Sequence, residues 1–225
     1  MKKILPPSRP KRDNATLDAI VEHFDLARHR ASLIYVRGYY LDTLGKRGVD
    51  DTNIYDDAVF LVSPNIRDSW NANTSPSFPE KGYAELVLGK YVYYPAYHHI
   101  SDPRKRYKAL RPYPEGVVLK CTRNGKLSTC SHTNLHKGGV NPAAFDVVWS
   151  QGCMTVPASQ YADFQSRVFA EIERCNGDYI GSKTFSGKPS KLIDVVLIEN
   201  RSTPTGQHLY DAAGRMIRHL RGVPR

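Results

Sequence analysis

The chain has 225 residues, of which 40% are hydrophobic and 24% charged, as in an ordinary globular protein. Its formal net charge of +10 at pH 7 suits a polyanion, such as nucleic acid, teichoic acid, lipopolysaccharide or anionic lipid, without choosing among them. No apolar run is long enough for a transmembrane segment, and no zinc-finger spacing, RNA-binding aromatic signature or helix-turn-helix pattern indicates a specific nucleic-acid partner.

Residues 1–14 combine Pro, Lys and Arg with few apolar side chains, which predicts a basic flexible arm. Its positive charges are not followed by an apolar stretch, so we expect no signal peptide and synthesis in a cytoplasm. The next segment, 14–30, has apolar residues at near-helical spacing and predicts an amphipathic helix that packs on the main domain. These apolar residues are Leu17, Ile20, Val21, Phe24 and Leu26.

The middle of the chain predicts a mostly β fold with one or two packed α-helices. Strand-like segments rich in Val, Ile, Tyr and Leu alternate with clusters of Gly, Pro, Asn and Asp. We predict strands at 32–41, 55–63, 84–97, 115–129 and 191–199. The two long stretches 44–57 and 63–82 show no regular pattern, and connections of this length are usually lids or binding loops.

One long helix is predicted at 158–177. Four apolar residues, Tyr161, Phe164, Val168 and Ile172, share one face of it, and Gly177 is a plausible stop. A basic amphipathic stretch follows the last predicted strand. The expected organisation is therefore a basic arm at 1–14, a single catalytic domain at 15–200 and a basic tail at 201–225.

The four cysteines do not indicate a metal site or a disulfide. They form no CxxC pair, which argues against structural zinc. A hairpin turn centred on Asn124-Gly125 would set Cys121 opposite Ser128 and diagonal to Cys130, a poor register for a disulfide. We therefore expect reduced thiols.

Two other groups of residues are interpreted as structural. The aspartates of 50–57 lack the spacing and the glycine of an EF-hand, so we interpret them as loop caps and ion pairs and expect no metal. His98 and His99 are interpreted as a surface pair, since adjacent strand residues face opposite ways.

The most informative stretch is 132–157, HTNLHKGGVNPAAFDVVWSQGCMTVP. A Cys nucleophile needs a base, a group that orients the base and backbone N–H groups for the oxyanion. We predict two adjacent strands here, with Cys153 as nucleophile in the turn leaving the second and His136 as base. His132 is the alternative base on the same strand face. A backbone carbonyl or Asn134 would orient the imidazole, and Gly152 would let nearby N–H groups face the oxyanion.

His136 followed by Ser150-Gln151-Gly152-Cys153 resembles the signature of the L,D-transpeptidase (YkuD-type) catalytic domain. The resemblance covers mainly 130–157, extends weakly to GYAELVLGKYVYYPAY at 82–97, and is strongest to phage and prophage forms. It implies a β-sandwich-like fold, catalysis by a cysteine and no cofactor.

The motif residues Ser150 and Gln151 are expected near the substrate, and Gly138 or Gly139 would give the thiol and the substrate close access. Trp149 is expected in the core, with a place at the edge of the substrate cleft as the alternative. The chain departs from the family at two positions. Gln151 stands where His or Arg is frequent, and Thr155 stands where an Arg often lies near the substrate.

The resemblance implies a peptidoglycan-active enzyme that attacks stem peptides at the L-centre of the diamino acid through a Cys acyl-enzyme. We expect a phage endolysin-like hydrolase that acts on the cell wall in the periplasm, its basic termini favouring an anionic envelope surface. The alternatives are a transpeptidase that forms cross-links or exchanges D-amino acids, and a catalytically silent wall-binding or virion protein. Binding of nucleic acid is suggested by charge alone.

Overall fold

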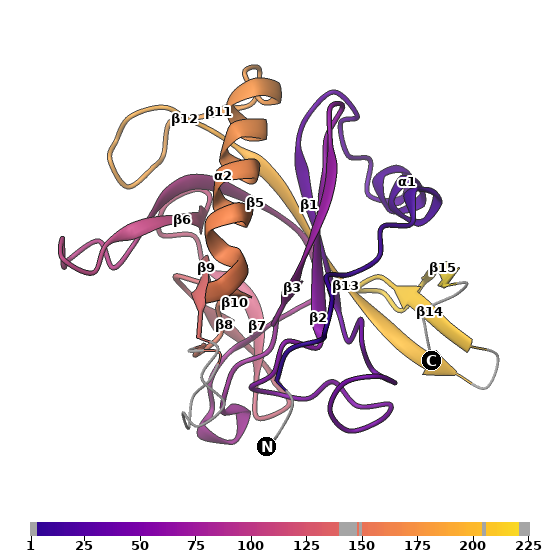
Figure 1. Ribbon diagram of the computed structural model, residues 1–225. Coiled ribbons are helices and arrows are strands. Elements are labelled where there is room, and N and C mark those ends of the chain that lie inside the picture. Colours follow the sequence, from indigo (N-terminus) through magenta and orange to yellow (C-terminus); the bar gives the residue numbers. More distant parts are fainter. Residues whose placement is uncertain (1–3, 140–147, 149, 204–205, 221–225) are drawn as a thin grey trace.

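The computed structural model describes residues 4–139, 148, 150–203 and 206–220 (Figure 1). In order along the chain, its elements are α1 (Asn14–His23), β1 (Ser32–Arg37), β2 (Asp57–Val62), β3 (Arg67–Ala72), the 3-10 helix η1 (Pro79–Lys81), β4 (Glu85–Leu86), β5 (Gly89–His98), β6 (Tyr107–Pro112), β7 (Leu119–Arg123), β8 (Lys126–Cys130), β9 (Leu135–Gly138), β10 (Met154–Pro157), α2 (Ala158–Cys175), β11 (Ile180–Gly181), β12 (Ser190–Lys191), β13 (Ile193–Thr203), β14 (Gly206–Tyr210) and β15 (Met216–Leu220). The prediction of a mostly β domain with one or two packed helices is confirmed.

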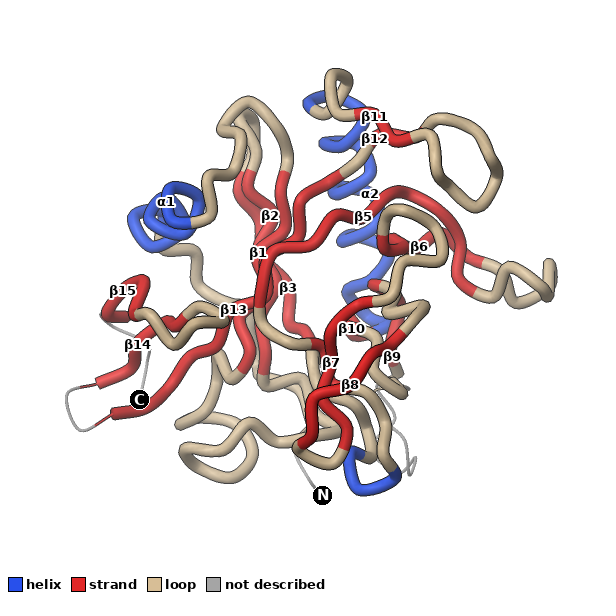
Figure 2. The backbone as a smooth tube through the Cα atoms, turned by 180° about the vertical axis from the view of Figure 1, so that it is seen from behind, coloured by secondary structure: helices blue, strands red, loops and turns tan. Residues whose placement is uncertain are grey.

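One ten-stranded sheet dominates the fold, in the order β10-β9-β6-β5-β13-β1-β2-β3, with β14 and β15 continuing from β13. Its two ends approach each other: Asn73, just after β3, and Thr155 of β10 exchange backbone hydrogen bonds of 2.9 and 2.8 Å. The sheet is therefore nearly closed. The β7–β8 hairpin and the β14–β15 hairpin project from different sides of it (Figure 2).

Both faces of the central strands are buried, because a helix covers each side. In β1, Leu33 and Tyr35 face the large core beneath α2, whereas Ile34 and Val36 face a second core beneath α1. Alternating side chains of β1 thus pack into two different cores. This explains why residues 33–36 form a continuous hydrophobic run. The predicted apolar face of α2 is confirmed, since its four residues are all buried.

Helix α1 is shorter than predicted. It ends at His23 instead of Arg30, because Asp25 takes a left-handed conformation with a φ of 47°. The N–H of Leu26 then returns to the carbonyl oxygen of Val21 at 2.9 Å. Leu17, Ile20, Val21 and Leu26 are buried, so the helix packs on the domain as expected.

The structure differs from the predicted flexible arm and separate tail. Ile4 is only 8% exposed, and its carbonyl oxygen accepts a hydrogen bond from the N–H of Tyr55 at 2.9 Å. The carbonyl oxygen of Pro10 accepts from Ser69. At the other end, β13 runs on to Thr203 and pairs with β14. Backbone pairing and a few buried apolar side chains hold the described parts of both segments to the domain despite their charge.

Strands β3 and β6 were not predicted. β3 lies within the stretch 63–82, and its polar sequence RDSWNA hides the alternation that marks a strand. The register of the β7–β8 hairpin was predicted correctly: Cys121 is opposite Ser128, Cys130 is opposite Leu119, and both thiols are free. Within the described residues, no helix is both long enough and apolar enough to cross a membrane.

Candidate functional site

Cys153 stands at the beginning of β10, beside β9. The two strands are parallel, with Met154 opposite Leu135 and Thr155 opposite His136. Met154 and Leu135 point into the core beneath α2. Since side chains alternate along a strand, Cys153 and Thr155 lie on the other face, which is also the face of His136. The predicted pair of adjacent strands is thus present, but the turn with the Cys leads into the second strand instead of leaving it.

Ser150 holds this turn together. Its hydroxyl donates to the carbonyl oxygen of Cys153 at 2.6 Å and accepts from the N–H of Gly152 at 3.1 Å. Its backbone N–H donates to the hydroxyl of Ser77 at 3.0 Å. Ser150 is fully buried. It fixes the backbone at Cys153, and the expectation that it contacts the substrate does not agree with its burial.

Only glycine fits at position 152. Gly152 has a φ of 139°, and a Cβ there would lie 2.5 Å from the carbonyl oxygen of Ala84. The N–H of Ala84 in turn donates to the carbonyl oxygen of Gln151 at 3.1 Å. The Gln151 side chain is exposed. Because Ser150 accepts from the N–H of Gly152, the N–H of Cys153 is the donor that can face an oxyanion, and among the described contacts it has no partner.

The imidazole of His136 has a fixed tautomer. Its Nδ1–H donates to the carbonyl oxygen of Lys137 at 2.8 Å, and the Tyr107 hydroxyl lies 3.2 Å from the same nitrogen. Nε2 therefore carries the lone pair and can accept a proton. The backbone carbonyl is the predicted kind of orienting group. Asn134, the other candidate, contacts His98 instead.

The thiol and the imidazole are both neutral in this state. Burial raises the pKa of Cys153 to about 11, although a hydrogen bond from the backbone of Asn134 acts in the opposite direction. Burial lowers the pKa of His136 to about 4. The thiol of Cys153 donates to the carbonyl oxygen of His132 at 3.5 Å, and the described contacts include no hydrogen bond between Cys153 and His136. Catalytic hydrogen bonds are often loose before substrate binds.

His98 belongs to the site, contrary to its interpretation as part of a surface pair. Its ring stacks on His136 with centroids 4.2 Å apart and an angle of 11°. The side-chain amide of Asn134 lies 3.1 Å from His98 Nδ1, and burial lowers the pKa of His98 to about 3. His99 is exposed, as predicted.

Strand pairing explains why His98 was missed. It ends β5 and lies opposite Tyr107 at the start of β6, and β6 in turn pairs with β9. No local pattern in the sequence indicates this meeting of three strands.

The remaining predicted residues lie elsewhere. His132 precedes β9 in a left-handed conformation with a φ of 59°, and its side chain is exposed, so it does not share the face of His136. Gly138 and Gly139 are buried against Tyr55, whose hydroxyl donates to the carbonyl oxygen of Gly139. They allow close packing of the chain instead of access for substrate. Trp149 lies outside the described residues.

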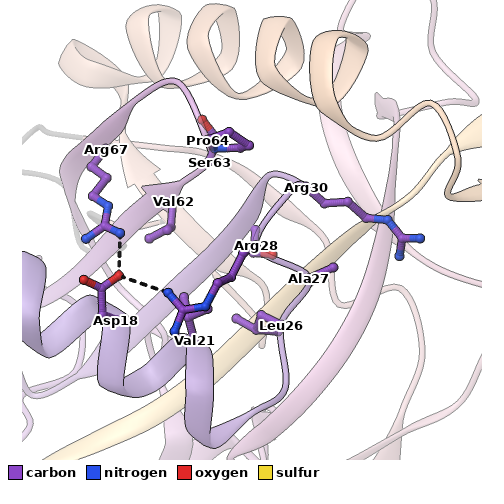
Figure 3. Close-up of a pocket in the computed structure, with 11 residues that line it drawn as sticks. Asp18, Val21, Leu26, Ala27, Arg28, Arg30, Val62, Ser63, Pro64 and Arg67 are labelled. Carbon is purple, nitrogen blue, oxygen red and sulfur yellow. Dashed lines mark hydrogen bonds and ion pairs between the residues drawn. The ribbon is translucent and has the colours of Figure 1, made fainter.

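A separate cavity of about 260 Å³ lies between α1 and the β2–β3 turn (Figure 3). Arginines line this cavity, but two of them already form ion pairs with Asp18: Arg67 at 2.5 Å and Arg28 at 3.8 Å. Arg30 pairs with Asp178 at 2.8 Å. Each of these three arginines already has a carboxylate partner within the protein, so this cavity is a weaker candidate than the Cys153 region.

The arrangement around Cys153 can thus support nucleophilic catalysis, with a thiol, a base of defined tautomer and a free backbone donor close together. Comparison with known proteins adds no assignment: no family model matches the chain, and no match to it is found among the curated proteins or the solved structures.

Proposed function

We propose that this protein is a peptidoglycan-active cysteine enzyme of the L,D-transpeptidase (YkuD-type) kind, and that it cleaves stem peptides at the L-centre of the diamino acid. One observation carries the proposal. The Ser150–Cys153 turn holds the thiol at the start of β10, on the face shared with His136, whose Nδ1–H is fixed by the Lys137 carbonyl. This fits the resemblance of the motif in both residue type and role.

The first half-reaction follows from the neutral pair. As Sγ of Cys153 attacks the peptide carbonyl carbon, its proton passes to Nε2 of His136. The oxyanion accepts a hydrogen bond from the N–H of Cys153, and such a donor contributes about 3 kcal/mol to transition-state stabilisation. The carbon–nitrogen bond then breaks. The leaving amine takes the proton from Nε2, and a thioester remains on Cys153.

The second half-reaction decides between hydrolysis and transfer. Water gives a proton to the neutral Nε2 of His136 and adds to the thioester carbonyl. The thiol then leaves and recovers its proton. An acceptor amine would follow the same course and form a new peptide bond. We favour hydrolysis, since a phage enzyme gains from cutting the wall, and the net charge of +10 suits an anionic envelope.

The experiment is a digest of purified Gram-negative peptidoglycan, read by mass spectrometry of the released muropeptides. The wild type is compared with Cys153→Ala and, as a matched control, with Cys175→Ala, a half-buried cysteine at the end of α2. Loss of D-Ala, or opening of cross-links at the diamino acid, should require Cys153 and not Cys175.

New cross-links or exchanged D-amino acids would assign transfer instead of hydrolysis. An unchanged muropeptide profile with folded wild-type protein would reject the enzyme and favour a silent wall-binding protein.

A further inference from the structure

Three aspartates converge where the long loop after β1 returns to the sheet. Asp50 and Asp56 come from this loop and Asp57 begins β2. One carboxylate oxygen of each lies within 4.8 Å of those of the other two. Asp56 and Asp57 are fully buried. Three carboxylates this close repel one another strongly unless something neutralises them.

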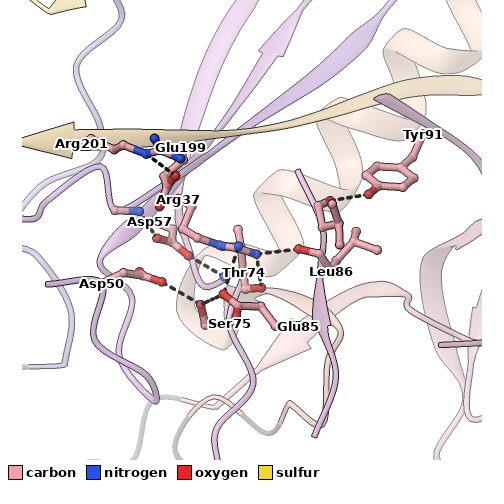
Figure 4. A network of polar contacts seen from close by, with 12 residues as sticks. Arg37, Asp50, Asp57, Thr74, Ser75, Glu85, Leu86, Tyr91, Glu199 and Arg201 are labelled. Carbon is pink, nitrogen blue, oxygen red and sulfur yellow. Dashed lines mark hydrogen bonds and ion pairs between the residues drawn. The ribbon is translucent and has the colours of Figure 1, made fainter. Parts of the chain in front are cut away.

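The cationic side chain beside this cluster, Arg37, already forms an ion pair and hydrogen bonds with other groups. Its Nη1 pairs with Glu85 at 3.0 Å, its Nε donates to the Thr74 hydroxyl at 3.1 Å, and its Nη2 donates to the carbonyl oxygen of Leu86 at 3.0 Å (Figure 4). Among the described contacts, Arg37 forms no ion pair with the three aspartates. Arg37 acts electrostatically on Asp50 and Asp57, but one cation that also pairs with Glu85 offsets at most one of these four carboxylates.

Hydrogen bonds satisfy only some of the carboxylate oxygens of the three aspartates. Asp57 accepts from the backbone N–H groups of Gly38 and Thr74, both at 2.6 Å. Asp50 Oδ2 accepts from Ser75 at 2.9 Å, and Asp56 Oδ2 accepts from the N–H of Asp51 at 2.7 Å.

The other oxygen of Asp50 and of Asp56, Oδ1 in both, is buried and has no hydrogen-bond partner among the described residues. A buried oxygen without a partner is costly, so these two atoms point to a missing ligand of positive charge.

We propose that Asp50, Asp56 and Asp57 bind a calcium ion. The two unpartnered oxygens and a carboxylate oxygen of Asp57 would be its ligands. Calcium lies 2.3–2.6 Å from its oxygen ligands, so oxygens up to about 5 Å apart can share one ion. It also accepts the irregular geometry of a loop, whereas magnesium requires a near-ideal octahedron. Burial raises the pKa of all three carboxyl groups, and repulsion from the neighbouring carboxylates adds to the rise for Asp50 and Asp56, which a bound cation would relieve.

The ion would stabilise a loop that supports the segment before Cys153. Tyr55, which lies between Asp50 and Asp56 in the chain, donates to the carbonyl oxygen of Gly139. Asn53 accepts from the N–H of Val148 at 3.0 Å. Asn73 donates to the carbonyl oxygen of Ile54 at 2.9 Å and joins β10 through Thr155. The site is therefore structural, and it does not depend on the proposed activity.

Thermal unfolding of the full chain after treatment with EDTA tests the proposal. Calcium at a hundredfold excess over its Kd should raise the unfolding midpoint by about 5–10 °C, the shift expected of a single-site ligand for a chain of this size. Magnesium at the same concentration, which matches the charge and ionic strength, should give a smaller rise. Titration calorimetry should show one calcium per chain. No rise with calcium, or an equal rise with magnesium, would overturn the assignment.

Asp56→Asn gives a sharper pattern, with Asp102→Asn in the β5–β6 connection as its control. Without calcium, the unfolding midpoint of Asp56→Asn should be higher than that of the wild type, because repulsion among the three carboxylates falls. With calcium, it should melt below the wild type because a ligand is lost. In Asp102→Asn, calcium should raise the unfolding midpoint as much as in the wild type. If Asp56→Asn does not fold, Asp50→Asn replaces it. A calcium gain that persists in the folded variant would contradict the site.

Discussion

His136 is enclosed by His98 on one side and Tyr107 on the other, and this environment sets both its orientation and its proton affinity. Burial favours the neutral ring, and the Lys137 carbonyl selects the Nδ1–H tautomer. The ring can therefore accept a proton at Nε2 at any pH above its lowered pKa. An imidazole near the surface would be partly protonated at mildly acidic pH, whereas burial keeps that of His136 neutral.

The same burial predicts a loss of stability in acid. The pKa of His136 falls from 6.5 to about 4 on folding, so between these values the unfolded chain binds the extra proton. The contribution of the neutral, buried His136 to the free energy of unfolding is therefore complete above pH 6.5 and is lost as the pH falls toward 4. His136→Gln stays neutral, so the stability of the variant relative to the wild type should rise by about 2 kcal/mol from pH 7 to pH 4.5. Urea unfolding at both pH values measures this, and a constant difference would contradict a buried neutral imidazole.

The raised pKa of Cys153 predicts slow alkylation at neutral pH. Only the thiolate reacts, and below a pKa of about 11 its fraction increases tenfold per pH unit. Iodoacetamide should therefore modify Cys153 about 100 times faster at pH 9 than at pH 7. Peptide mass spectrometry separates this residue from the other three cysteines. A rate that levels off below pH 8 would indicate a preformed thiolate–imidazolium pair.

At the scale of elements, the turn into β10 depends on close contact between two chain segments. Ala84 lies against the Gly152 backbone, while Ser77 and Ser150 form two hydrogen bonds of 2.8 and 3.0 Å. Neither contact is local in the sequence. The long stretch 63–82, predicted to be a lid or binding loop, instead forms β3 and then supports the turn that holds Cys153.

Gly152→Ala tests this contact. The added Cβ would meet the Ala84 carbonyl oxygen at 2.5 Å and would force an unfavourable φ of 139°. We expect a loss of about 2–4 kcal/mol in the free energy of unfolding, together with loss of activity. Gly187→Ala is the matched control, because Gly187 also has a positive φ but open space around it. Its cost should be about 1 kcal/mol. Equal losses in the two variants would show that the contact with Ala84 is unimportant.

At the scale of the molecule, Asn176 joins the helix to the sheet. It caps the C-terminus of α2 and is fully buried. Its Oδ1 accepts from the N–H of Ala31 at 2.8 Å, and its Nδ2 donates to the carbonyl oxygens of Ala31 and Leu192 at 3.1 and 2.7 Å. One side chain thus connects the starts of β1 and β13 to α2, which covers the large core.

Replacing Asn176 with Ala would leave three buried backbone groups without partners. Each costs about 1–3 kcal/mol, so we expect Asn176→Ala to lower the free energy of unfolding by about 3–5 kcal/mol. Chemical denaturation measures the loss. Asn65→Ala is a suitable comparison because Asn65 is exposed and donates to Glu171 at 3.2 Å, and it should cost under 1 kcal/mol. A similar small cost for Asn176→Ala would contradict its role in joining the elements.

The sequence alone determined the features that depend on neighbouring residues. The period of apolar residues predicted α2 and the strands that bury both faces, and Asn124-Gly125 predicted the register of Cys121 in its hairpin. These features follow from local periodicity and turn chemistry, which act over a few residues. The adjacent strands of His136 and Cys153 were instead predicted from their motif and its resemblance to a known family.

Only the tertiary structure decided which distant residues meet. His98 reaches His136 across paired strands, Ser77 reaches Ser150, and the loop of Asp50 folds back onto β2. The packing of Ile4 also depends on a partner far along the chain. These contacts arise because sheet closure and core packing bring remote segments together. No local pattern in the sequence indicates which segments will meet.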